Sequence, residues 1–152
     1  MRRERLLPED QARQILKSAP YGILSTIMPD GTPYGVPLNY YYDEEENAIF
    51  FHCAMTGLKL DSLAVHSRVS FTVVTKAGID APKLTTYYES AIATGVASFI
   101  SSDEEKKKRL DGLCRALTPD VSADTCHSFH HTAMVRISVE SVTGKRNEPR
   151  KR

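Results

Sequence analysis

Residues 22–42 read GILSTIMPDGTPYGVPLNYYY, and this stretch decides the fold class. Two extended runs flank Asp30 and Gly31, and an Asp-Gly pair between such runs is a strong hairpin signal. The second run, residues 34–42, alternates between two faces as a single β-strand does. Pro37 lacks a ladder donor, which indicates an edge position or a bulge. The stretch therefore predicts an antiparallel hairpin at the margin of a sheet.

Beyond the hairpin, the spacing of apolar residues predicts four further strands and three helices. The strands are expected over residues 48–52, 69–74, 85–100 and 133–139, and the helices over residues 8–18, from about 56 onward, and behind 102. Gly95 interrupts the longest strand, where a bulge would let it bend. Ser102 and Glu105 fit a capping box. The acidic segment 43–47 is expected to form a solvated turn.

About six strands with few helices indicate a mainly β (α+β) protein, a six-stranded antiparallel barrel with flanking helices. Pro37 and Gly95 point to incomplete closure of this barrel, which makes it a split barrel. The 152 residues, with a mass of 17.0 kDa, fit one domain, and neither a repeat nor a linker divides them. We expect residues 1–7 and 145–152 to be flexible tails.

Charge and composition narrow the possible roles. The chain has 20 Lys and Arg against 19 Asp and Glu, a net charge of +1, whereas nucleic-acid binding usually needs a dominant basic face. No apolar run approaches the roughly 18 residues that span a bilayer. Residues 8–11 are polar where a signal peptide needs an apolar stretch. We therefore expect a cytoplasmic protein with no nucleic-acid or membrane partner, whose three cysteines are reduced.

The segment 52–61, HCAMTGLKLD, carries the clearest candidate site. We expect Thr56 to cap the helix, which places Lys59 in its first turn. A cation there faces the positive end of the helix dipole at a cost of about 0.3–1 kcal/mol. A lysine at this position is explained if backbone N–H groups, Thr56 and Lys59 together bind a phosphate. Gly57, which has no side chain, would let the phosphate approach closely. The alternative is that Lys59 points to water and is offset by Asp61.

An ordered set of motifs extends across nearly the whole chain. It consists of Gly22-x-Leu24-x-Thr26, Asp30-Gly31-x-Pro33-Tyr34-x-x-Pro37-Leu38-Asn39-Tyr40, Phe51-His52-x-Ala54-x-x-Gly57-x-Lys59-Leu60-Asp61, Val69-x-Phe71, Tyr88-Glu89-Ser90-Ala91-Ile92-x-x-Gly95 and Ile137-x-Val139-x-x-Val142-Thr143-Gly144-Lys145. This set resembles the pyridoxamine 5′-phosphate oxidase-related flavin proteins, especially their nitroimidazole-resistance branch. The resemblance implies a split β-barrel that binds FMN in a groove between the two subunits of a homodimer.

The resemblance also implies which residues hold the cofactor. The expected contacts are Lys59 and Thr56 on the flavin phosphate, Ser25 and Thr26 along the ribityl chain or phosphate, Asn39 and Tyr40 at the isoalloxazine, and Tyr88 and Ser90 on the long strand. His52 would lie near the flavin ring or a bound substrate, and we expect it to be the catalytic proton donor. The basic Ser-Arg-Lys triplet of the true oxidases is absent, which argues against vitamin B6 oxidation.

Two functions fit these residues. The first is an FMN-dependent oxidoreductase that reduces small aromatic or nitro compounds. The alternative is a non-catalytic protein that binds flavin, haem or a deazaflavin on the same barrel, with His130 or His131 as candidate haem ligands.

Two other segments carry residue types that can bind a metal or a charged partner. Residues 126–131, CHSFHH, carry metal-ligand types together with Cys114, but their spacing does not match that of structural zinc sites. We therefore predict no metal site. The basic tail from Lys145 onward is either solvated or reaches the flavin groove of a partner subunit.

Overall fold

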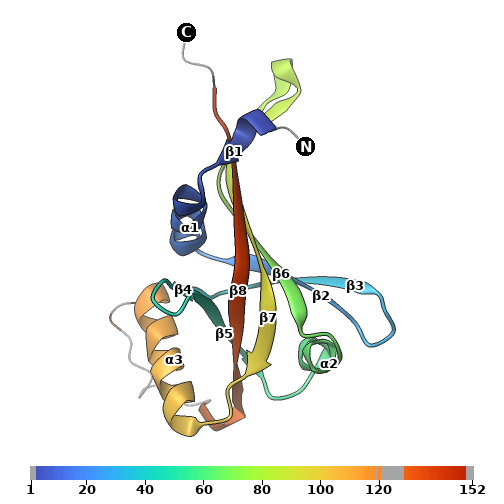
Figure 1. The fold of residues 1–152 in the computed structure, drawn as a ribbon, viewed down its shortest axis with the longest axis vertical. Helices are drawn as coiled ribbons and strands as arrows, with labels where there is room; N and C mark the ends of the chain where they lie inside the picture. The colour runs from blue at the N-terminus through green and yellow to red at the C-terminus, as the bar shows by residue number, and fades with distance from the viewer. Residues whose placement is uncertain (1–2, 119, 121–128, 150–152) are drawn as a thin grey trace.

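The structure is a computed structural model, which describes residues 3–118, 120 and 129–149. These residues form one antiparallel sheet of eight strands, in the order β3-β2-β6-β7-β8-β5-β4, with β1 paired to β8 (Figure 1). The strands are β1 (Leu6–Leu7), β2 (Gly22–Ile27), β3 (Pro33–Leu38), β4 (Tyr41–Asp43), β5 (Ala48–Ala54), β6 (Arg68–Asp80), β7 (Thr85–Phe99) and β8 (Thr132–Asn147). The helices are α1 (Glu9–Ser18), α2 (Leu58–Val65) and α3 (Asp103–Leu117), with short 3-10 turns at Arg3–Arg5, Ala81–Lys83 and Phe129–His131.

The barrel is split between β3 and β4, which follow each other in the chain but lie at opposite ends of the strand order. The chain passes from one sheet edge to the other at Asn39 and Tyr40. Alternation in the sequence does not reveal this change of partner, so the single strand expected over residues 34–42 is in fact two strands. The mainly β split barrel is confirmed, with eight strands rather than six. Pro37 lies on edge strand β3, as predicted.

The predicted hairpin turn and bulge are both confirmed. In the turn between β2 and β3, the Thr32 N–H donates to Asp30 Oδ1 at 2.9 Å, and Gly31 has φ +88°, in the left-handed region that favours glycine. At Gly95 the register between β7 and β8 shifts. A Cβ at Gly95 would lie 2.1 Å from the Ser138 carbonyl oxygen, so the strands approach this closely because glycine has no side chain.

The main core lies inside the curved sheet, where alternate residues of the strands point inward. Its fully buried members include Leu24, Phe51, Phe71, Val135 and Ile137. Helix α1, expected over residues 8–18, covers this core with Ala12, Ile15 and Leu16.

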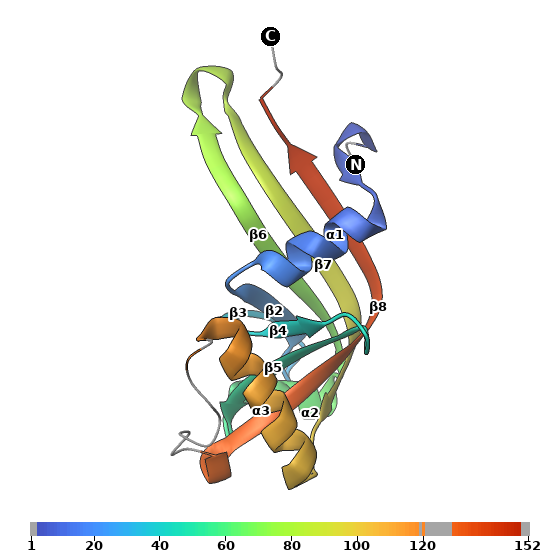
Figure 2. The same ribbon diagram turned by 90° about the vertical axis from the view of Figure 1, so that its left-hand side faces the viewer.

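Helix α3 packs against β5 and β8 on the other face of the sheet (Figure 2). Its start is capped as predicted, with the Glu105 N–H donating to Ser102 Oγ at 3.3 Å. Its contact forms a second, smaller core made of Ala48, Phe50, Leu110, Leu113 and Met134.

Arg109 of α3 is the centre of an ion-pair network beside this smaller core. The residue is 3% exposed, its guanidinium carbon is 4.2 Å from the centroid of the Phe50 ring, and it pairs with Asp43, Glu46 and Glu105. Asp43 and Glu46 belong to the acidic segment that we expected to be a solvated turn. The segment is a turn in which Glu44 and Glu45 are exposed as expected, but Asp43 and Glu46 also anchor α3, because a buried guanidinium requires carboxylate partners.

Parts of the two segments that we expected to be flexible tails belong to the sheet. Leu6 pairs with Lys145 and Leu7 with Gly144, so residues 6–7 and 145–147 belong to the sheet. Strands β6 and β7 extend past the barrel as a hairpin arm, residues 75–88 (Figures 1 and 2). Among the described residues, no helix has the length and apolar character needed to cross a bilayer.

Candidate functional site

The start of α2 is the first part of the candidate site. Strand β5 ends at Ala54, and the chain turns through residues 55–57 into the helix. Gly57, not Thr56, precedes the first helical residue, with φ +124°, a conformation that L side chains rarely adopt. Thr56 is exposed and does not cap the helix, which corrects the expectation from sequence. No side chain of the described residues caps this start, so the first-turn N–H groups of Leu58 and Lys59 point out of the helix end without a capping partner there.

Lys59 is the second residue of α2, in the first turn as predicted. Its side chain is half-buried, and its Nζ lies 5.8 Å from the centroid of the Phe51 ring. In the part of the chain that the structure describes, no carboxylate lies within ion-pair distance of this ammonium, and Asp61 does not offset it. An unpaired cation therefore stands beside uncapped N–H groups, an arrangement suited to an anion.

His52 projects from β5 just before this helix start, with Met134 of β8 as its register partner. Partial desolvation, aided by the Lys59 cation, lowers the pKa of His52 below its ordinary value. The imidazole is therefore mostly neutral at pH 7. In this form it can accept a proton at one ring nitrogen and release one from the other. Cys53, the next residue, points into the core, and burial raises the pKa of its thiol.

Thr26 points into the barrel from β2, the strand against which α2 packs. The residue is 5% exposed, and its Oγ1 has no hydrogen-bond partner among the described residues. An unsatisfied buried hydroxyl costs about 1–3 kcal/mol, so this position favours a polar partner that the described residues do not supply. Sequence alone could not reveal this, because it does not show which hydroxyls stay unpaired.

Three other predicted contacts occupy different surroundings. Ser25 lies on the opposite face of β2 from Thr26. Asn39 donates from Nδ2 to the Pro20 carbonyl oxygen at 3.2 Å. Tyr40 is buried in the core, where its hydroxyl donates to the Leu16 carbonyl oxygen and burial raises its pKa. Tyr40 therefore packs the barrel, and its hydroxyl is already used.

Tyr88 and Ser90 lie near the arm, at the opposite end of β7 from α2. The α2 end is marked by Phe99, which lines a cavity together with residues of α2. At about 3.3 Å per residue, the path along the strand from Phe99 is roughly 30 Å to Ser90 and somewhat longer to Tyr88. One chain therefore does not bring these two residues to the helix start where His52 and Lys59 meet.

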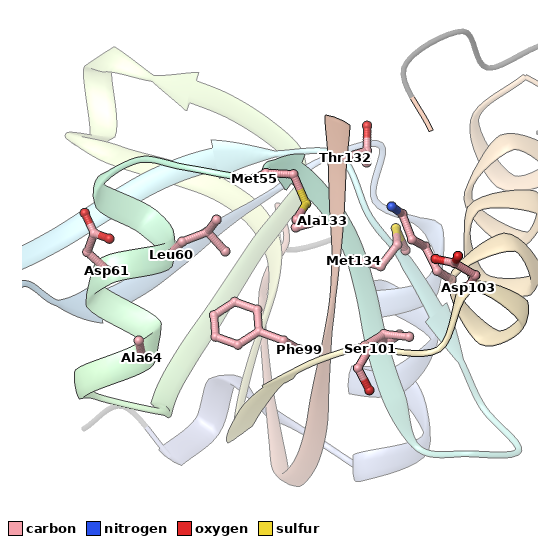
Figure 3. A pocket seen from close by; sticks show the side chains of 12 residues that line it. Met55, Leu60, Asp61, Ala64, Phe99, Ser101, Asp103, Thr132, Ala133 and Met134 are labelled. Carbon is pink, nitrogen blue, oxygen red and sulfur yellow. The ribbon is translucent and has the colours of Figure 1, made fainter. Parts of the chain in front are cut away.

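The cavity beside α2 was not predicted from the sequence. Its volume is about 430 Å³, and it lies between α2, the end of β7, the start of α3 and the start of β8 (Figure 3). Met134, the register partner of His52, forms part of its wall. Lys106 of α3 also lines it, although the run from Lys106 to Arg109 resembles an exposed helix face in the sequence.

The cysteine and histidine cluster predicted to bind no metal is only partly visible. Cys126, His127 and Ser128 lie outside the described residues, whereas His130 and His131 belong to a 3-10 turn. Within the described ranges, no three His, Cys, Asp or Glu side chains gather closely enough to hold a metal ion.

The strand order and the flanking helices place the chain in the split β-barrel class. The sequence model of the pyridoxamine 5′-phosphate oxidase family matches residues 8–146, and the chain belongs to this family. A search of the curated proteins found no match.

Several solved structures share the fold. A proposed 5-nitroimidazole antibiotic resistance protein from Bacteroides thetaiotaomicron is 23% identical, with a TM-score of 0.79 over 92% of this chain and 85% of its own. The flavocytochrome Anf3 from Azotobacter vinelandii is 20% identical, with a TM-score of 0.77 over 93% and 68%. An FAD and haem binding protein from Mycobacterium smegmatis is 18% identical, with a TM-score of 0.79 over 93% and 72%.

Proposed function

We propose that the chain binds FMN at the start of α2 and acts as a flavin-dependent reductase of small aromatic or nitro compounds. The observation that carries this proposal is the unpaired Lys59 ammonium at an uncapped helix start, next to His52. The phosphate of FMN supplies the anion that this arrangement lacks. The unpaired Thr26 hydroxyl is a second feature that a bound polar group would satisfy. When bound, FMN supplies hydride or electron transfer.

The residues of this chain have separate tasks in the proposed reaction. Lys59 and the N–H groups of the first turn bind the phosphate, and Thr26 donates a hydrogen bond toward the same ligand. His52, whose lowered pKa keeps its imidazole mostly neutral between turnovers, takes a proton from solvent at one ring nitrogen and passes a proton to the reduced substrate from the other. The apolar ring of Phe51 and the helix exclude water from the base of the site.

We further propose that the active form is a homodimer with the cofactor site at the subunit interface. Tyr88 and Ser90 are too far along β7 to reach Lys59 of their own chain, but a second chain can supply them. The outward face of β2, β6 and β7 carries Ile23, Val74 and Ile92, which are 43%, 49% and 41% exposed. Exposed apolar side chains on one sheet face are typical of an interface. Light scattering on the purified protein tests this, and Ile92→Asp should yield monomers, whereas a monomeric wild-type protein would contradict it.

The reductase activity is tested with the purified protein loaded with FMN. NADH or NADPH should bleach the flavin absorbance, and a nitroimidazole should restore it. The variant His52→Ala should turn over more slowly while it binds the same amount of FMN, because His52 acts on the substrate and not on the phosphate. Unchanged turnover in this variant would remove His52 from the mechanism.

A second candidate is a binding protein for flavin, haem or a deazaflavin that has no turnover of its own. The fold similarity to a protein that binds FAD and haem favours this alternative. Absorbance of the protein as purified separates the cofactors, because haem gives a Soret band and flavin gives bands in the blue. Flavin that stays oxidised with both nicotinamide donors would favour the binding protein over the reductase.

A further inference from the structure

The cavity between α2 and α3 has mostly apolar walls. Leu60 of α2 and Phe99 at the end of β7 face the same space, with Met55 and Met134 nearby (Figure 3). Its volume of about 430 Å³ falls in the range of small-molecule sites. Such walls favour an aromatic or aliphatic group.

Lys106 gives this cavity a buried charge. The residue is 8% exposed, although a lysine is almost never so buried unless it is paired. Its Nζ lies 4.4 Å from the centroid of the Phe129 ring, and no carboxylate of the described residues lies within ion-pair distance. Arg109 lies one turn further along α3 and is also buried, but it pairs with three carboxylates, as buried cations usually do. Lys106 is the buried cation whose anion the described chain does not supply.

Two acidic residues also line the cavity, and both are exposed to solvent. Asp61 lies on the outer side of α2, away from the other labelled side chains, and Asp103 is the first residue of α3 (Figure 3). Water and salt screen these exposed carboxylates more than they screen the buried Lys106. The acidic rim disfavours ligands with several negative charges, so the arrangement suits a single one.

We propose that this cavity binds a small apolar monocarboxylate, such as an aryl acid. The apolar part lies among Met55, Leu60, Phe99 and Met134, and the carboxylate accepts a hydrogen bond from the Lys106 ammonium. The carboxylate contact lies on α3 at Lys106, whereas the proposed FMN phosphate contact lies on α2 at Lys59, so this proposal does not require flavin binding.

Methionine methyl groups allow a direct test by ¹³C NMR, because the chain has only four methionines. Phenylacetate is the probe, and its neutral analogue phenylacetamide is the matched control ligand. Phenylacetate should shift the methyl signals of Met55 and Met134 but not that of Met28, which lies in the turn between β2 and β3. Phenylacetamide should bind more weakly, because it cannot form the charge-assisted hydrogen bond.

Two variants separate charge from packing. Lys106→Met keeps the long apolar stem and should weaken phenylacetate binding about ten- to hundredfold, with phenylacetamide binding unchanged. The exposed neighbour provides the control, since Lys107→Met should bind phenylacetate as the wild type does. Equal affinity of the wild type for the two probes would overturn the proposal without any variant. Unshifted Met55 and Met134 signals, or undiminished phenylacetate binding by Lys106→Met, would overturn it as well.

Discussion

Replacing Lys59 by methionine should separate binding from stability. A cation in the first turn of a helix costs about 0.3–1 kcal/mol, and the contact with Phe51, at 5.8 Å from the ring centroid, returns about 0.5 kcal/mol. The free energy of unfolding of the FMN-free variant should therefore stay within about 0.5 kcal/mol of the wild-type value. Loss of a charge-assisted contact to phosphate, worth about 1.5–3 kcal/mol, should raise the dissociation constant for FMN about ten- to hundredfold.

Both quantities are measurable on the same protein. Urea unfolding can be followed by tyrosine fluorescence, because the chain has seven tyrosines and no tryptophan. FMN binding is followed by the change in flavin fluorescence on titration. The control Lys108→Met removes an exposed lysine of α3 and should alter neither quantity by much. If Lys59→Met lost more than about 1 kcal/mol of stability and bound FMN normally, Lys59 would be a structural residue and the phosphate site would be wrong.

Three further predictions concern Thr26, Arg109 and His52. Thr26→Val removes an unsatisfied buried hydroxyl, so the free energy of unfolding should rise by about 1 kcal/mol while FMN affinity falls; a less stable variant would mean that the hydroxyl has a partner within the chain. Arg109→Met should lower the free energy of unfolding, measured in urea, by about 3 kcal/mol. This value is near the low end for a broken buried ion pair because the carboxylate partners are partly solvated. A loss below about 1 kcal/mol would contradict this prediction. The pKa of His52 in the folded protein lies below its ordinary 6.5, so the unfolded chain binds more protons just below that pH. Stability should therefore fall as the pH drops below about 6.5, and His52→Asn should flatten this part of the pH profile; an identical profile would show that His52 does not contribute.

The parts of the fold that could be predicted from sequence are those set by local chemistry. The turn at Asp30 and Gly31, the cap at Ser102 and the bulge at Gly95 each follow from what one or two residues can do with their backbone. The same holds for Pro37, which cannot donate to a central ladder. These features were enough to predict an incompletely closed antiparallel barrel.

The parts that could not be predicted depend on which distant segments meet. The division of residues 34–42 into β3 and β4 leaves the alternation of side chains unchanged. The sequence pattern therefore does not indicate where one strand ends and the other begins. The acidic segment after Tyr42 reads as a solvated turn until Arg109 is known to pack against it. The unpaired hydroxyl of Thr26 and the burial of Lys106 likewise depend on the assembled structure.

The candidate site was predicted in part. Lys59 and His52 lie within eight residues of local sequence, and in the structure the Lys59 charge acts on the His52 imidazole. Thr56 was assigned the cap because threonine commonly caps helices, whereas the φ of Gly57 decides where the helix begins. Tyr40 was assigned to the ring of the cofactor, yet its hydroxyl is used by the Leu16 carbonyl oxygen within the core.

The position of β8 in the sheet has a consequence for synthesis on the ribosome. This strand follows all the others in the chain, yet it pairs with β1, β7 and β5. Until residues 132–147 leave the exit tunnel, the nascent chain exposes open edges on β5 and β7, which can pair with neighbouring chains. Completion of the barrel must therefore follow translation of its final strand.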